Sequence, residues 1–408
     1  MSVSDSEFTT EPVPESRTVP WWRVGVISAM VAFSLPTFLT GMEVSLVLPG
    51  SDGFVALFWG SLLLAVIASI SGSIGARTHL SSYMLVRIAF GDKGAALVNV
   101  AFAVSLLGWF GVNIDLFSGA VDRLLADSVG LSLPTWLVEL AAGAVMTITT
   151  IYGFRAINTL SLVLVPVMMA VTASLITSSL DVRPLAEILA VEPSERYALG
   201  RGISSVVGGV IVGAVIMPDV TRFIRHWRGA IYTAVLAYFF VGIIVMSAGG
   251  LAAAALERDD LLEIMLMVGL GWGAFAIVIA GSWVLNSLNL YSTMLSVEAT
   301  WPALNNRFLV IVLGALGTGA AFLNILDVFL TFLFYLAIVF VPVAGVIMID
   351  YIVTRRSAYH EEREALQADV RVTAIGAWAI GAAIALVGEN TATSLSGVAA
   401  LDAMISAA

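Results

Sequence analysis

The chain has 408 residues, of which 59% are hydrophobic and 12% are charged, and it contains no cysteine. Because soluble domains carry roughly 25% charged residues, this composition excludes a soluble globular protein and indicates an integral membrane protein. The lack of cysteine excludes disulfides, thiolate catalysis and cysteine-based metal sites. We assign the net charge of −10 to exposed acidic segments, and we expect no nucleic-acid partner.

Residues 1–22 are polar and acidic and lack the features of a cleavable signal, so we expect a cytoplasmic tail. Apolar segments long enough to cross about 30 Å of hydrocarbon follow, and they predict an all-α polytopic membrane protein with about 12 transmembrane helices. Segment 79–91 is too short to cross, and the last predicted span is short and contains Asp402. The predicted spans are 24–48, 54–76, 95–118, 134–154, 158–178, 202–220, 229–255, 265–296, 307–325, 328–352, 371–388 and 393–407.

Lysine and arginine residues predict the orientation, because cytoplasmic loops are enriched in them. With a cytoplasmic N-terminus, fourteen of the 19 fall on the inner side. We therefore expect a protein of the cell inner membrane with both termini cytoplasmic.

Helix-breaking residues occur in the first and sixth predicted spans. The first contains Ser34 to Thr37, with Pro36, and the sixth contains Gly208, Gly209, Gly213 and Pro218. Interrupted helices at matching positions of two halves point to an inverted-repeat transporter with its site at the membrane midplane. The alternative is that glycine and proline are simply frequent in membrane helices.

The spacing of five spans predicts a LeuT-type 5+5 inverted repeat plus two C-terminal helices. Its parts would be a first repeat over 23–180, a second over 200–353, a cytoplasmic linker over 354–370 and the additional helices over 371–408.

Charged side chains inside spans are costly, at about 2.5–3.5 kcal/mol each, and therefore suggest function. Near span ends, Glu139 and Asp327 can reach interfacial water, while Asp219 beside Arg222 predicts a gate-locking or anchoring ion pair. The deeper carboxylates leave ion coupling and an internal hydrogen-bonded pair both open, and they are Glu43 and Asp115.

Trp109 and Asn113 are four residues apart and thus share a helix face. An indole beside an amide suits a flat heteroaromatic ring, because it offers stacking and paired hydrogen bonds. Asn286 and Asn289 provide a second amide-bearing wall, whereas Asp115 is rotated away from the Trp109 face. The alternatives are a packing tryptophan and polar contacts between helices.

An enzyme is not expected. The three histidines, His79, His226 and His360, fall in predicted loops, and neither GxGD nor HExxH occurs. An intramembrane enzyme is therefore a remote alternative, and no cofactor is expected.

Several segments together carry a resemblance to a known family. They are EPVPES (11–16), the 73–95 block, GWFGV (108–112), DVTRF (219–223), the Trp-Asn-Leu-Tyr frame of 283–291 and the 341–356 block. Nearly end to end, the chain resembles the nucleobase:cation symporter family of purine and cytosine permeases, most closely its bacterial cytosine permeases. The resemblance implies a LeuT-type fold and ion-driven uptake of a nucleobase or related heterocycle.

The resemblance also implies residue roles. Trp109 would stack on the substrate, Asn113 matches an amide of hydantoin-transporting relatives, and Asn286 matches the asparagine of the eighth helix. The substrate-lining positions at the two interrupted helices would be Phe33, Ser34, Gly209 and Val210.

Two departures from the family pattern matter. Residues 209–212 lack the stacking phenylalanine and its flanking serines. The matched sodium positions, Gly281, Val284 and Leu285, lack hydroxyls, although a hard cation needs oxygen ligands, and Ser282 and Ser287 are expected to face elsewhere. We hypothesise either proton coupling through Glu43 or Asp115, or facilitated diffusion.

These patterns predict a secondary active transporter that imports a small planar nitrogen heterocycle by alternating access, with Na⁺ or H⁺ as the possible coupling ion. Cytosine or another nucleobase is the first expectation. Hydroxymethylpyrimidine (a thiamin precursor), hydantoin and allantoin are the alternatives, and the oligomeric state is left open. A facilitator with parallel repeats would need a long basic central loop, which the sequence lacks.

Overall fold

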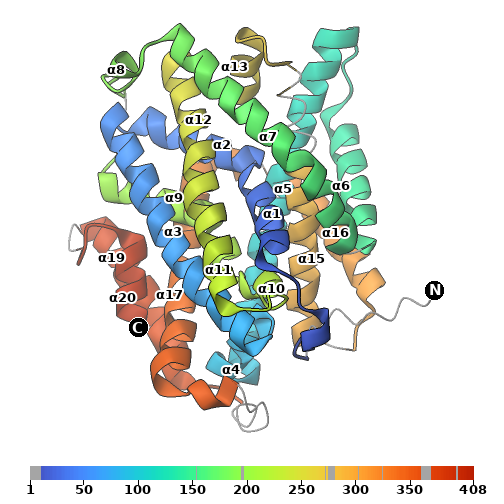
Figure 1. Ribbon diagram of the computed structural model, residues 1–408, viewed down its shortest axis with the longest axis vertical. Helices are drawn as coiled ribbons and strands as arrows, with labels where there is room; N and C mark the ends of the chain where they lie inside the picture. The colour runs from blue at the N-terminus through green and yellow to red at the C-terminus, as the bar shows by residue number, and fades with distance from the viewer. Residues whose placement is uncertain are drawn as a thin grey trace.

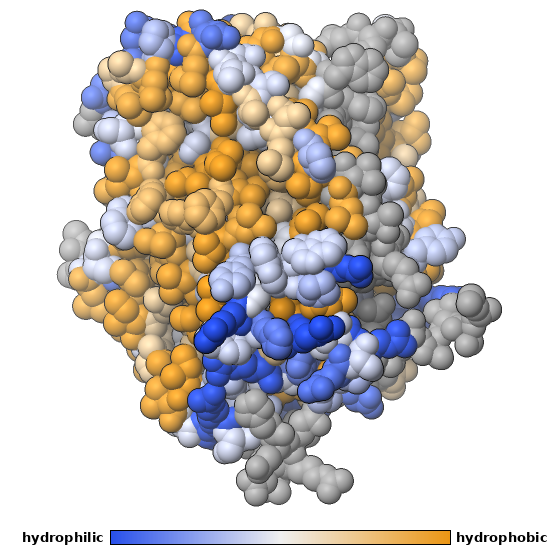
Figure 2. Space-filling view, viewed as in Figure 1, coloured by the Kyte–Doolittle hydropathy of each residue, from blue (hydrophilic) through white to orange (hydrophobic). Residues whose placement is uncertain are grey.

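The computed structural model describes residues 11–152, 154–193, 197–271, 273, 281–301, 303–323, 325–359, 369–391 and 394–408. Within these ranges the regular elements are helices, and most of the long ones run roughly parallel to one another in Figure 1. A band of hydrophobic residues covers much of the face in Figure 2. This arrangement suits a chain that satisfies its backbone hydrogen bonds within each span.

The elements are η1 (Glu15–Arg17), α1 (Trp21–Ala32), α2 (Leu35–Val47), α3 (Gly50–Thr78), α4 (Ser82–Phe90), α5 (Asp92–Val129), α6 (Thr135–Ile151), α7 (Phe154–Val182), α8 (Leu185–Ile188), α9 (Leu199–Val215), α10 (Pro218–Thr221), α11 (Trp227–Ala234), η2 (Val235–Val241), α12 (Gly242–Leu256), α13 (Leu261–Met267), α15 (Ser282–Thr300), α16 (Asn306–Ala321), η4 (Ile325–Val328), α17 (Phe329–Ile349), η5 (Asp350–Thr354), η6 (Arg356–Tyr359), α19 (Val372–Thr391) and α20 (Ala399–Ala407).

Ten of the twelve predicted spans correspond to apolar helices. Among the described residues, six segments are long and apolar enough to cross a membrane, and the bent pair α1 and α2 makes a seventh. Three shorter apolar helices, α6, α16 and α19, match further predictions. The predicted short segment 79–91 contains α4. The number of twelve transmembrane helices is not confirmed, because the other two segments differ from prediction.

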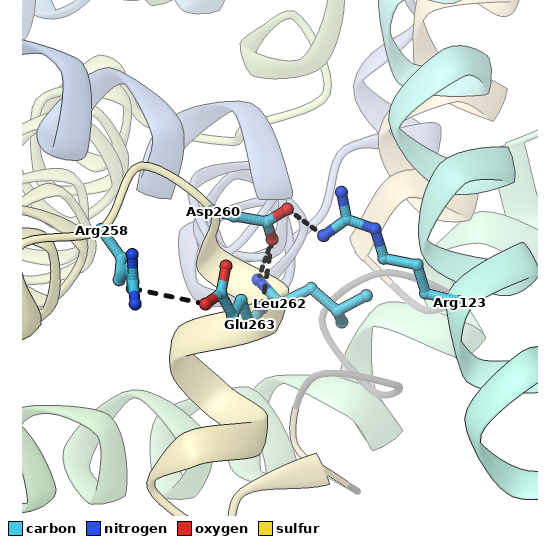
Figure 3. Close-up of polar contacts among 5 residues, drawn as sticks. All are labelled: Arg123, Arg258, Asp260, Leu262 and Glu263. Carbon is cyan, nitrogen blue, oxygen red and sulfur yellow. Dashed lines mark hydrogen bonds and ion pairs between the residues drawn. The ribbon is translucent and has the colours of Figure 1, made fainter.

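The predicted span 265–296 begins too early. Residues up to Met267 belong to the separate helix α13, which is followed by Gly269 at a positive φ of 75°. Figure 3 shows why α13 is a distinct element: Asp260 caps it by accepting from the backbone N–H groups of Leu262 and Glu263, and it also contacts Arg123 at the end of α5. A capped helix that is paired to another segment has its own start.

The predicted span 393–407 is wrong as a crossing helix. Helix α20 has nine residues, so at 1.5 Å per residue it is about 14 Å long. Asp402 organises the preceding turn, accepting from the hydroxyls of Ser394 and Ser396 at 2.5 and 2.6 Å and from the backbone N–H groups of Leu395 and Ser396 at 3.0 and 2.8 Å. These bonds explain a carboxylate in this otherwise apolar segment.

The predicted interruption of the first span is confirmed. Helices α1 and α2 meet at an angle of 52°, and Ser34 between them is extended, with φ −88° and ψ 154°. Pro36 lies at the start of α2, where its missing N–H costs no helical hydrogen bond. The backbone groups freed at this break face the interior.

The interruption of the sixth span lies later than predicted. Helix α9 runs without a break through Gly208, Gly209 and Gly213, and it ends at Val215 before Pro218 opens α10. Gly208 instead permits a close contact, because a Cβ atom there would lie 1.7 Å from the Leu333 carbonyl oxygen of α17. Proline, which cannot continue a helix, sets the break.

The segment before α1 is attached to the body of the protein. Val13 is 2% exposed, and its N–H donates to the His79 carbonyl oxygen at 3.0 Å. Val19 forms a parallel bridge with Ile224: its N–H donates to Phe223 O at 2.6 Å, and its carbonyl accepts from Arg225 N at 3.2 Å. We call residues 11–20 the N-terminal strap.

Candidate functional site

A cavity of about 140 Å³, which we call the central cavity, lies among α1, α2, α5, α9, α10, η2, α12 and α15. Most of its lining side chains are apolar. An apolar cavity of about 150 Å³ can hold benzene. The central cavity therefore has room for one small ring.

Trp109 of α5 lines the central cavity and is 6% exposed. Its indole is held edge-on by Phe329 and Phe332, with ring centroids 6.0 and 5.5 Å away. Such edge contacts between aromatic rings are favourable, and they fix the ring's orientation. Trp109 is thus a buried, pre-positioned aromatic surface.

Asn289 of α15 also lines the central cavity, whereas Asn286 lies behind it. The Asn289 amide donates to Asn286 Oδ1 at 3.4 Å. Asn286 in turn donates to the Phe110 carbonyl oxygen at 3.0 Å. The two amides are therefore brought together as predicted, with Asn289 facing the cavity and Asn286 positioning it.

Asn113 does not line the central cavity, in contrast to the prediction that it faces it together with Trp109. The Asn113 amide folds back onto its own helix and donates to the Trp109 carbonyl oxygen at 2.7 Å. Its Oδ1 is buried and accepts no hydrogen bond from any described residue. This hydrogen bond holds the Asn113 amide against its own helix, although the two residues are only about 40° apart around the helix.

Of the four substrate-lining residues predicted at the two interrupted helices, three line the central cavity and one does not. Ser34, Gly209 and Val210 line the central cavity. Phe33 does not, because it is 3% exposed and packs in a hydrophobic cluster behind the break. Thr37, which the sequence did not single out, lines the cavity, with its hydroxyl 3.1 Å from that of Ser34.

Asp219 lines the central cavity and is 4% exposed. Its Oδ1 accepts from the Ser82 N–H of α4 at 2.8 Å, and Arg222 Nε donates to its backbone carbonyl at 3.1 Å. The Tyr83 hydroxyl donates its only proton to the Ser292 carbonyl oxygen at 2.7 Å. Asp219 therefore anchors α10 and also faces the cavity, which the prediction of an ion pair with Arg222 did not include.

The other predicted carboxylates lie elsewhere. Glu43 of α2, Asp115 of α5 and Glu139 of α6 are not among the residues that line the central cavity. Asp327 falls in η4, and its side chain lies outside the described part of the structure. Proximity to the cavity therefore distinguishes Asp219 from them.

The predicted sodium positions lie at the start of α15. Leu285 lines the central cavity, and Val284 is 1% exposed. Gly281 packs against the break between α1 and α2, where a Cβ atom would lie 2.9 Å from the Phe33 carbonyl oxygen. The hydroxyls of Ser282 and Ser287 are buried without a hydrogen-bond partner among the described residues.

Tyr238 is a cavity residue that sequence reasoning missed. It belongs to η2, a π-helical turn, and lines the central cavity opposite Gly213, where a Cβ atom would lie 3.1 Å from the Tyr238 hydroxyl. π-Helical turns are frequent at functional sites. The only signal in the sequence was Gly213, since nothing in an apolar segment reveals a π-turn.

The histidines are not gathered at this site. The His79 ring nitrogen Nδ1 lies 2.7 Å from the Arg222 carbonyl oxygen, and His226 precedes α11. His360 is outside the described residues.

A bent first helix, a proline break after α9 and a cavity between them are the features of a multi-pass membrane transporter. Residues 12–407 match the family model described as permease for cytosine/purines, uracil, thiamine, allantoin. The chain therefore belongs to this permease family, which confirms the expected resemblance. Its relatives are named as permeases and transporters, not as enzymes.

Individual relatives agree with this assignment. The chain is 28% identical to the cytosine permease of Escherichia coli (strain K12) over 357 residues, covering 87% of this chain and 83% of that one. It is 23% identical to the hydantoin permease of Microbacterium maritypicum, covering 83% and 74%.

Solved structures match the fold. Mhp1, a nucleobase-cation-symport-1 family transporter in a closed conformation with bromovinylhydantoin bound, has a TM-score of 0.84 at 20% identity, covering 97% of this chain and 92% of that one. Inward-facing Mhp1 has a TM-score of 0.81 at 17% identity, covering 97% and 90%.

Proposed function

We propose that this permease is a secondary active transporter that imports a small planar nitrogen heterocycle by alternating access, with the ring stacked on Trp109. The observation that carries the proposal is the buried indole of Trp109, which faces a one-ring cavity next to the interrupted first helix. Relatives named as cytosine and hydantoin permeases support the substrate class.

The polar groups of the central cavity would select the heterocycle. Asn289 offers both a donor and an acceptor, while Ser34 and Thr37 offer hydroxyls next to the break. A site built to hydrogen-bond a substrate rejects analogues that leave its buried polar groups unpaired. Cytosine or another nucleobase is the first candidate, ahead of hydroxymethylpyrimidine, hydantoin and allantoin.

The substrate class can be tested with purified protein and a thermal-shift panel of nucleobases, hydantoins, allantoin and hydroxymethylpyrimidine. A ligand that binds only the folded state raises the melting temperature in proportion to RT ln(1 + [L]/Kd). We expect a concentration-dependent rise for one heterocycle class. No rise with any of these compounds at saturating concentration would contradict the proposal.

Tyr238 would supply the aromatic wall that the sixth helix lacks. We expect Tyr238→Phe to weaken heterocycle binding about 5- to 10-fold, because a hydrogen bond contributes about 1 kcal/mol. Tyr238→Ala should weaken it further by removing the ring. Isothermal titration would measure both, with Tyr232→Phe, which lies in α11 outside the central cavity, as the control. Unchanged affinity in both Tyr238 variants would exclude the residue from the site.

The coupling ion would be a proton rather than sodium, since the matched α15 positions offer no hydroxyl. We add Asp219 to the candidate proton carriers because it borders the central cavity, whereas Glu43 and Asp115 lie outside the cavity lining. In proteoliposomes we expect an inward proton gradient to drive uptake without sodium, and Asp219→Asn to reduce this uptake more than Glu43→Gln or Asp115→Asn. Strict sodium dependence would contradict proton coupling without affecting the heterocycle site.

A further inference from the structure

A second cavity lies where α1 and α11 begin, and it shares no lining residue with the central cavity. Its volume is about 530 Å³, and we call it the α1–α11 cleft. Three aromatic side chains and three basic ones dominate its lining: Trp21, Trp227, Tyr232, Arg225, His226 and Arg228. Figure 2 shows hydrophilic residues gathered below the apolar band, over the part of the molecule where Figure 1 places α10, α11 and the lower end of α1.

Among the described residues, no acidic side chain offsets the positive charge of the cleft, since none of its lining residues is acidic. Within the described part of the chain, the side chains of Arg225, His226 and Arg228 form no ion pair or hydrogen bond, and the Arg228 guanidinium carbon lies 5.6 Å from the centre of the Trp227 ring. The two exposed arginines therefore leave this cavity positively charged in a protein with a net charge of −10.

A neighbouring helix adds to the same feature. The Arg77 guanidinium carbon, from the last turn of α3, lies 4.2 Å from the centre of the Trp227 ring. This cation–π contact orients the indole and brings further positive charge close to the cleft. Aromatic side chains therefore form the walls, and guanidinium groups surround the opening.

The position of the cleft distinguishes a lipid from a dissolved anion. Trp21 and Trp227 are the first residues of two membrane-spanning segments, so the cleft lies where those segments leave the bilayer. Tryptophan, tyrosine and arginine are enriched at this depth, and basic pockets between membrane helices bind phospholipid headgroups. The same two membrane-spanning segments also carry exposed apolar side chains, among them Trp22 and Phe240.

We propose that the α1–α11 cleft binds the phosphate of an anionic glycerophospholipid, with Arg225 and Arg228 as its ligands. The planar guanidinium groups can each bond two phosphate oxygens. The acyl chains would lie along the exposed apolar side chains of the segment that continues from α11, such as Phe240 of η2 and Ile244 of α12. The N-terminal strap is bonded to residues 223 and 225 and contributes Pro20 to the lining of the cleft, so that lipid binding would tether the start of α1 to α11.

The test uses the full chain in detergent, titrated with phosphatidylglycerol or phosphatidylcholine and observed by native mass spectrometry. Wild-type protein should prefer phosphatidylglycerol, and Arg225→Gln with Arg228→Gln should weaken its binding roughly 30-fold, the effect of removing two arginines near an anionic surface. Both arginines are exposed, so the double variant should fold, and its melting temperature checks this.

A control double variant, Arg307→Gln with Arg356→Gln, removes the same charge away from the cleft and should bind phosphatidylglycerol like wild type. Equal loss in both double variants, or no loss in the first, would overturn the proposal. Displacement of phosphatidylglycerol by millimolar inorganic phosphate, but not by sodium chloride of equal ionic strength, would show a soluble-anion site and overturn the lipid assignment. These readouts are independent of heterocycle transport.

Discussion

Trp109→Ala should weaken heterocycle binding by about 5- to 150-fold, because stacking on an aromatic side chain contributes about 1–3 kcal/mol per ring. Phe329 and Phe332 of α17 contact the indole edge-on, and the indole itself lines the central cavity. Trp109→Phe should restore most of the affinity, because it keeps a ring at the same position. Isothermal titration with the heterocycle found in the thermal-shift panel measures both variants.

The matched control for Trp109→Ala is Trp59→Ala in α3, whose indole is 52% exposed. It removes the same number of atoms from the outer surface and should leave affinity unchanged. If Trp109→Ala bound the heterocycle within twofold of wild type, the central cavity would not be the substrate site, whatever the substrate class.

Gly208→Ala should lower the stability of the folded protein by about 3 kcal/mol or more, the upper range for overpacking a close contact. The new methyl carbon would lie 1.7 Å from the Leu333 carbonyl oxygen, and backbone of α17 cannot rotate away as a side chain could. Since α9 also carries Gly209 and Val210 of the central cavity, any separation of α9 from α17 should reduce heterocycle binding as well. Thermal unfolding in detergent measures the first effect.

Gly319→Ala in α16 is the control for this substitution, because no atom outside its own helix lies within 4 Å of the added carbon. Alanine is favoured over glycine in a helix interior by up to about 1 kcal/mol, so this variant should unfold at the same temperature or slightly higher. Equal melting temperatures for Gly208→Ala and wild type would mean that α9 and α17 are not in such close contact.

The sequence predicted the spans well where apolar length alone determines them, and it predicted the first interruption because Pro36 is visible. It misplaced the second, because Gly208 and Gly209 serve close helix packing and only Pro218 breaks the helix. Asp402 was unexplained as part of a span, since a carboxylate that caps a turn through four hydrogen bonds depends on contacts that composition does not encode.

At the candidate site, helical spacing correctly paired Asn286 with Asn289 but could not say which amide faces the cavity. The same spacing failed for Asn113, whose amide bonds to the Trp109 carbonyl oxygen. The cavity position of Tyr238 could not be predicted, because a π-turn shifts which side chains of a helix face inward. The position of Asp219 could not be predicted either, because it is set by the contact between α10 and α4. The sequence therefore predicted which kinds of residue form the site, whereas the side chains that face the cavity are determined by tertiary contacts.

The N-terminal strap links the movements of the two interrupted helices. Its hydrogen bonds to residues 223 and 225 join the start of α1 to the chain that leaves α10, so both interrupted helices are connected at one end. Any motion that opens a path from the central cavity at this end must move the two helices together or break these hydrogen bonds. A fusion partner should accordingly be attached ahead of residue 11, where it leaves these hydrogen bonds intact.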